Sequence, residues 1–113
     1  MRFTPVEPPR EFVAGVTGVR LRDCARIELE AGELVTFVTP EGREVDFTAT
    51  AWGFYPLPSL DGRLAAQGFR TALVRNGAGK HFVNVVARDQ VAEFEAYLAA
   101  EQNTLVEWLD ARE

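Results

Sequence analysis

The stretch that decides the fold is ARIELEAGELVTFVTPEGREVDFTATAWGFY, residues 25–55. Ile27 and Leu29 alternate with charged residues, LVTFVT is β-branched and aromatic, and from Val45 apolar residues again take every second position. Strict alternation predicts strands with one solvated face. The short turns AGE and PEGR between these runs predict an antiparallel meander.

A hairpin and a helix follow the meander. FRTALVR and HFVNVVA flank NGAGK, whose Asn-Gly pair is typical of a hairpin turn. The segment RDQVAEFEAYLAAEQN predicts an amphipathic helix with Asp89 as its N-cap. Its apolar face carries Val91, Phe94, Tyr97 and Leu98. We therefore expect an α+β fold, with an antiparallel sheet of five or six strands, meander plus hairpin, covered by this C-terminal amphipathic helix.

The two ends of the chain are less regular. Three prolines within residues 1–12 predict an extended Pro-rich arm, because proline fixes φ and lacks a backbone donor. The last segment, TLVEWLDARE, has two interpretations. Thr104 with Glu107 resembles a capping box and favours a short helix, which is our preferred interpretation. Val106 and Trp108 alternate with Glu107 as they would in a strand.

Length and composition predict a single domain over residues 1–113, with 47% apolar and 26% charged residues. The one cysteine, Cys24, allows no intrachain disulfide, and one Cys with one His cannot build a typical zinc site. No apolar run approaches the ~20 residues that span a bilayer, and the pattern of residues 1–12 is not typical of a secretory signal. We expect a cytoplasmic protein with no cofactor and no membrane contact.

Charge is unevenly distributed. The net charge of −5 argues against general nucleic-acid binding. Residues 62–88 contain no acid, whereas seven acids and one base, Arg112, follow from residue 89. Either the two segments form ion pairs inside the fold, or the basic one forms a cationic surface for a small anion or an acidic partner. The basic residues are Arg63, Arg70, Arg75, Lys80 and Arg88.

The longest irregular connection begins at WGFYPLPSLDGR, residues 52–63. In one interpretation its aromatic side chains close an end of the core and its arginine pairs with an acid. In the other it is a binding loop, because aromatic rings offer a stacking platform and arginine a planar fork for phosphate or carboxylate. The following DGRLAAQG predicts one helical turn, with Asp61 or Ser59 as its cap and Gly68 as its stop. The candidate binding residues are Trp52, Tyr55, Asp61, Arg63, Arg70, Lys80 and His81, and we predict no catalytic or metal-ligating residue.

WGFYPLPSLDGRL, followed by EFEAYLAAE and VEWLD, resembles a pattern shared by a family of small uncharacterised bacterial single-domain proteins. The resemblance covers most of the chain and implies a stand-alone domain. It brings no activity and no functional residue with it.

Three hypotheses for function follow. The leading one is a small accessory or binding protein that takes a small anion, such as a nucleotide or sugar phosphate, or an acidic partner, near residues 52–63 and the hairpin 70–81. The alternative is a homo-oligomer, in which a sheet edge pairs with a second copy or the acidic helix of one copy meets the basic hairpin of the other. A small enzyme is the third. It would fix an anion with Arg63 or Lys80 and move a proton with His81 or Asp61. It would need Asp61 or another carboxylate within hydrogen-bond reach of His81.

Overall fold

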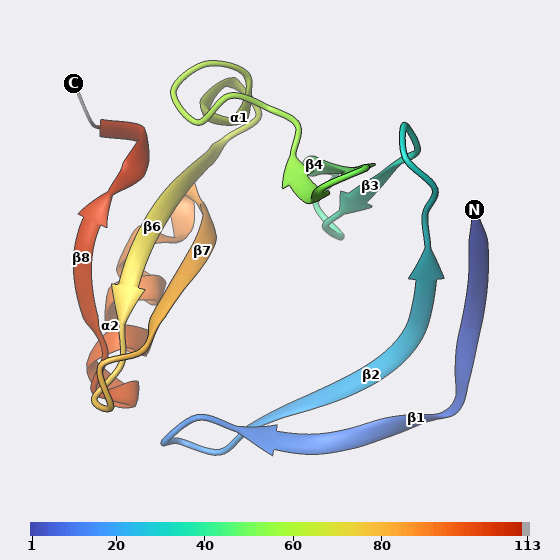
Figure 1. The fold of residues 1–113 in the computed structure, drawn as a ribbon. Helices are drawn as coiled ribbons and strands as arrows, with labels where there is room; N and C mark the ends of the chain where they lie inside the picture. The colour runs from blue at the N-terminus through green and yellow to red at the C-terminus, as the bar shows by residue number, and fades with distance from the viewer. Residues whose placement is uncertain (112–113) are drawn as a thin grey trace.

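The computed structural model describes residues 1–111, and these form eight strands in three separate antiparallel sheets (Figure 1). The first sheet is a long hairpin, here called the arm, of β1 (Arg2–Ala14) and β2 (Val19–Glu28). The second contains β3 (Leu34–Val38), β4 (Glu44–Thr50) and β5 (Gly53–Pro56). The third has the order β7-β6-β8, with bounds β6 (Phe69–Arg75), β7 (His81–Ala87) and β8 (Thr104–Trp108).

Helices are few. The α2 helix (Val91–Glu101) confirms the predicted amphipathic helix and follows a 3-10 turn, η1 (Arg88–Gln90). The single helical turn α1 (Arg63–Ala66) also lies where DGRLAAQG predicts it, and a second 3-10 turn, η2 (Leu109–Ala111), follows β8. The α+β class is therefore right, whereas the single sheet of five or six strands is wrong.

The division into three sheets follows from how the strands pair. Each hairpin closes locally, so alternation and turn residues are enough to form it. Joining the hairpins into one sheet requires edge-to-edge pairing between distant segments, and the alternation pattern carries no information about that. In this structure the arm turns away after β2, and the connection after β5 separates the second sheet from the third (Figure 1).

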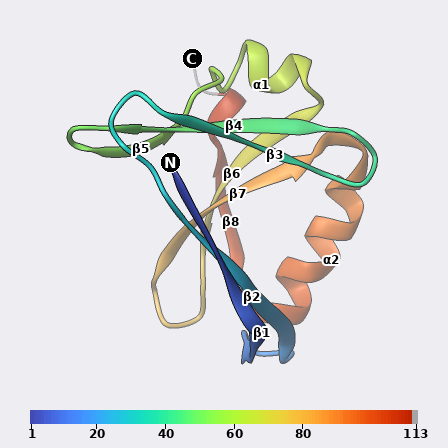
Figure 2. The same cartoon turned by 90° about the vertical axis from the view of Figure 1, so that its right-hand side faces the viewer.

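The core lies between α2 and one face of the third sheet. Ala72 and Val74 of β6 are buried there against Leu98 of α2. Phe94, one turn earlier, packs on the same cluster, which confirms that Phe94 and Leu98 face the sheet, whereas Tyr97 of the predicted stripe is 43% exposed. Seen from the side, α2 covers only this one sheet (Figure 2).

The preferred interpretation of the last segment is wrong. Residues 104–108 are a strand because β6 offers a free edge to which they add, and Val74 pairs with Leu105. The pairing slips by one residue between Leu73 and Val74, and the strand gives way to η2 after Trp108. Tertiary pairing here overrides a local capping signal, as commonly happens for short segments.

The predicted extended arm at residues 1–12 is extended, but it is longer than expected and paired. β1 runs to Ala14 and pairs antiparallel with β2. The ladder is irregular between Pro5 and Arg10, where the prolines cannot donate hydrogen bonds. An irregular, proline-bearing strand is tolerated because β1 is an edge strand.

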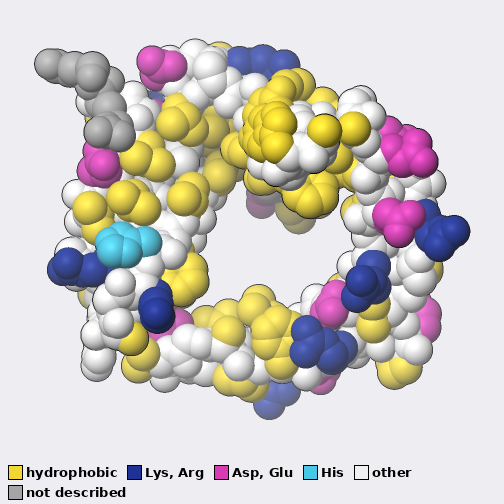
Figure 3. Space-filling view, in the orientation of Figure 1, with side chains coloured by type: hydrophobic (Ala, Val, Ile, Leu, Met, Phe, Trp, Pro, Cys, Tyr) yellow, Lys and Arg dark blue, Asp and Glu magenta, His cyan; other side chains and the backbone are white. Residues whose placement is uncertain are grey.

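The whole molecule is an open frame rather than a filled globule. The Cα radius of gyration is 15.5 Å, whereas a compact domain of this length has about 13 Å. Figure 3 shows an opening through the middle of the molecule, with the arm on one side and the third sheet on the other. Many large apolar side chains consequently remain exposed.

Candidate functional site

The aromatic residues of the 52–63 connection do not close the core. Trp52 lies in the tight turn before β5 and is 74% exposed, and Phe54 is 64% exposed. Trp52 and Tyr55 stack on each other with ring centroids 5.6 Å apart. They form a flat aromatic surface on the second sheet, so the interpretation that these rings seal the core is wrong.

Arg63 is engaged inside the fold. Its Nη2 donates to Oδ2 of Asp46, and the hydroxyl of Thr36 donates to the other oxygen of that carboxylate at 2.8 Å. Asp46 is buried on β4. The predicted pairing of Arg63 with an acid is therefore confirmed, and the pair joins α1 to the second sheet. The exposed Asp61 precedes it in the turn before α1.

Arg70 is also used by the fold. Its Nε donates to Oδ2 of Asp110 at 3.1 Å, and its guanidinium lies 3.9 Å from the ring centre of Trp108. Burial acts to raise the pKa of Asp110, but hydrogen bonds from the Thr71 amide and from Arg70 outweigh it and hold the pKa below its ordinary value. This is the predicted ion pairing between the basic segment and the acidic C-terminal segment.

Lys80 and His81 lie at the opposite end of β6 from Arg70. Both are exposed at the β6–β7 turn, and His81 pairs across the ladder with Arg75. No hydrogen bond or ion pair links His81 to a carboxylate within residues 1–111. The predicted site residues are thus spread over three places, and the arrangement that the enzyme hypothesis requires at His81 is absent from the described chain.

Two apolar surfaces stand out beside the opening. On β7, Phe82 is 50% and Val83 63% exposed, and within the described chain this strand pairs only with β6. On the arm, Val13 is 63% exposed, and Leu21, which lies opposite Phe12 in the ladder, is also exposed. Strand β7 carries no Lys, Arg, Asp, Glu or Pro, the residues that usually protect a sheet edge. Sequence reasoning missed this surface, although the lack of charged residues and proline in HFVNVVA could be read from the sequence.

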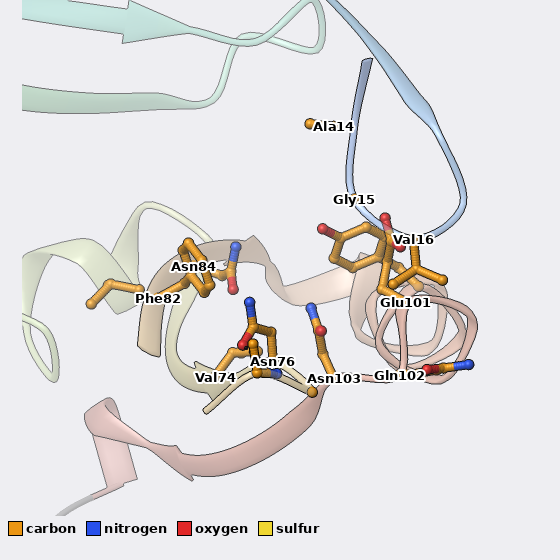
Figure 4. A pocket seen from close by; sticks show the side chains of 14 residues that line it. Ala14, Gly15, Val16, Val74, Asn76, Phe82, Asn84, Glu101, Gln102 and Asn103 are labelled. Atoms are coloured by element: carbon orange, nitrogen blue, oxygen red, sulfur yellow. Dashed lines mark hydrogen bonds between the residues drawn. The ribbon is translucent and has the colours of Figure 1, made fainter. Parts of the chain in front are cut away.

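A hollow of about 610 Å³ lies where the arm, the β6–β7 hairpin and the end of α2 approach one another (Figure 4). Asn76, Asn84 and Asn103 line it and point toward one another, with Phe82 beside Asn84. These are all the asparagines of the chain. Sequence reasoning missed the hollow, because its walls come from segments far apart in the chain. The one available signal was an asparagine in the otherwise apolar strand HFVNVVA.

The buried carboxylate of Glu101 holds the arm against the end of α2. Its Oε2 accepts the Thr17 amide at 2.8 Å, and its Oε1 accepts the Thr17 hydroxyl at 3.1 Å. Glu101 is 3% exposed and lines the hollow. A Cβ at Gly15 would overlap Glu101, so the turn of the arm approaches this carboxylate as closely as glycine permits.

Comparisons of the chain with protein-family models, with curated proteins and with solved structures found no match. In the part of the chain that the structure describes, no helix is both long and apolar enough to cross a membrane. Residues 1–111 also contain no group of three or more His, Cys, Asp or Glu side chains arranged to hold a metal ion. Cys24 is a free, exposed thiol on β2.

Proposed function

We propose that this chain is a homo-oligomeric interaction protein, in which the arm of one copy enters the opening of a second copy and packs on its β7 strand. The observation that carries the proposal is the open frame, with an uncharged, exposed apolar edge strand on one side of the opening and an exposed apolar arm on the other. Soluble monomers rarely leave apolar surface of this kind uncovered.

A second copy fits better than an unrelated partner for two reasons. The two apolar surfaces belong to the same chain, so one two-fold axis makes two equivalent contacts. Strand β7 carries no Lys, Arg, Asp or Glu, so the arm, which carries both basic and acidic residues, meets no repelling charge from such residues there. Burying apolar surface at about 25 cal/mol per Å² then drives assembly.

Strand β7 is a better contact than the edge strands β8 and β3. Strand β8 carries Glu107 and a register slip, both of which discourage edge pairing. Strand β3 is uncharged but has five residues against seven in β7. The choice between β3 and β7 can be tested directly, because each has a valine of similar exposure.

Sedimentation of the full chain at low and high salt tests the proposal. We expect a dimer under both conditions, because the contact is apolar rather than ionic. Val83→Lys on β7 and Val13→Lys on the arm, both 63% exposed, should each give folded monomers. Val38→Lys on β3, 58% exposed, is the matched control and should stay dimeric. A wild-type monomer at both salt concentrations would refute self-association.

If the wild-type dimer dissociates at high salt, the acidic helix and the basic hairpin form the contact instead. If Val38→Lys makes the dimer dissociate while Val83→Lys does not, β3 is the edge strand that forms the contact. Binding of a small anion near residues 52–63 stays a prediction. It has less support than self-association, because Arg63 and Arg70 are each occupied by an internal carboxylate.

A further inference from the structure

We propose that the hollow at the end of α2 binds an amino sugar, a small hydroxyl-rich molecule with a protonated amine. The hollow lies within the 300–1,000 Å³ that small-molecule sites occupy. Three asparagine amides converge in it from the β6–β7 turn, from β7 and from the loop after α2. This proposal does not require self-association, although the hollow shares Phe82 and Val83 with the β7 surface proposed as the contact between copies.

The three asparagine side chains have donor and acceptor groups that make no hydrogen bond to the described residues. Oδ1 of Asn76 accepts the amides of Ala78 and Lys80 and so shapes the turn, which leaves its NH₂ group for a ligand. The side chains of Asn84 and Asn103 make no hydrogen bond to any described residue. A side-chain amide both donates and accepts, as a hydroxyl does, so three such groups match a polyol.

Turn formation accounts for Asn76 but not for Asn84. Asparagine is depleted in strands, and Asn84 stands in the middle of an apolar one. It lies opposite the buried Ala72 and therefore projects to the same face as Phe82 and the core. Phe82, half exposed beside it, offers an apolar surface for the face of a sugar ring.

Electrostatics decides which sugar the hollow accepts. No Lys or Arg lines it, whereas Glu101 does, with both carboxylate oxygens held by Thr17. Glu101 receives hydrogen bonds from Thr17 but makes no ion pair with a described cation, and a buried carboxylate is costly without one. The carbonyl end of α2, which carries partial negative charge, lies beside it. The site therefore favours a protonated amine and disfavours a sugar acid.

Side-chain amide NMR offers a direct test on the full chain. Because all three asparagines line the hollow, every Asn side-chain signal reports on it, and the Gln67 and Gln90 signals serve as internal controls. Glucosamine and galactosamine are titrated beside glucose, galactose and the two corresponding uronic acids. We expect the shifts of the Asn signals to saturate at the lowest concentration with an amino sugar and at a higher concentration with its neutral parent. The uronic acid should not shift them.

Two variants separate the contributions. Asn84→Ala should weaken the binding of amino sugars and of neutral sugars by the same factor, roughly tenfold. Glu101→Gln should reduce the preference for the amino sugar over its neutral parent, with the neutral sugar unaffected. Gln90→Ala, at an exposed amide outside the hollow, is the matched control and should bind as the wild type does.

Unmoved Asn signals with every sugar would refute the proposal. Equal binding of an amino sugar and a uronic acid would refute its electrostatic part, as would an unchanged preference in Glu101→Gln. If Glu101→Gln loosens the arm, Asn84→Ala still decides whether sugars bind in the hollow.

Discussion

At the scale of single residues, the charged side chains in this protein mostly serve the fold. Arg63 holds the buried carboxylate of Asp46, and Arg70 holds Asp110 while its guanidinium lies over Trp108. Arg43 likewise pairs with Asp89 at 2.8 Å, so the residue expected to cap α2 instead links the second sheet to η1. The Arg63 and Arg43 pairs thus join the second sheet to α1 and to η1.

Replacing Arg63 should destabilise the protein. In Arg63→Ala the buried Asp46 loses its charged donor, and we expect the free energy of unfolding to fall by about 1.5–3 kcal/mol. Urea unfolding of the purified variant measures this. Arg75→Ala is the matched control, because Arg75 is exposed and makes no ion pair with a described residue, so its change should stay within ~0.5 kcal/mol. Equal stability of the two variants would mean that water screens the Arg63 pair.

At the scale of elements, the contact between α2 and the third sheet is the best-packed part of the molecule. Leu98 is 6% exposed, and Phe94 lies 5.9 Å from Trp108 between ring centroids. A helix of this length is marginal by itself, so the packing of its apolar face is what stabilises it.

Leu98→Ala should therefore be costly. Truncating a buried leucine removes apolar contact and leaves a cavity, and the expected loss is about 2–5 kcal/mol. Thermal and urea unfolding measure it. Glu95→Ala, on the exposed face of the same helix, should change stability by no more than ~0.5 kcal/mol. A Leu98→Ala protein as stable as Glu95→Ala would show that α2 is peripheral.

The junction of β6 with η2 should respond to pH through Asp110. The pKa of this carboxyl is lowered from its ordinary 3.8 in the folded protein, so the ionised form contributes stability above that value. The contribution is lost as the pH falls through the lowered pKa. Asp110→Asn should thus be less stable than the wild type near neutral pH, and the gap should narrow below about pH 4. Urea unfolding across this pH range measures the difference in stability between the two proteins. A difference that stays constant would contradict a stabilising role for the ionised Asp110.

At the scale of the whole molecule, the arm is held to the body at its two ends. The amino group of Met1 pairs with Glu33, and Thr17 bonds Glu101. The hydrogen bond to Glu33 raises the pKa of the Met1 amino group. The pKa of Glu33 is lowered, chiefly because its carboxylate accepts a hydrogen bond from the Glu30 amide. Between these two ends, exposed apolar residues of the arm border the opening.

Gly15→Ala should loosen the arm while the third sheet stays folded. A Cβ there overlaps Glu101, and the residue has φ +79°. Gly42→Ala is the matched control, because it has nearly the same φ, +89°, with open space around it. Hydrogen exchange should accelerate across β1 and β2 in Gly15→Ala but not in Gly42→Ala, and β6 should stay protected in both. Equal exchange of the arm in the two variants would show that Glu101 does not hold it.

Local features were predictable from the sequence because their causes are local. Alternation and turn residues specify the hairpins, and apolar spacing specifies α2 and the face that Leu98 presents to the sheet. Ser59 and Gly68 likewise mark the ends of the turn at α1. A partner for Arg63 and ion pairing between the basic and acidic segments were also predictable, although the particular acids were not.

Only the tertiary structure decided how these pieces combine. Whether residues 104–108 become helix or strand depends on the free edge of β6, and whether hairpins share one sheet depends on pairing between distant segments. The hollow exists because a turn of the arm, a hairpin and a helix end meet there, although Asn76, Asn84 and Asn103 are separated in the chain. Long-range contacts of this kind depend on burial and edge pairing, which residue spacing does not encode.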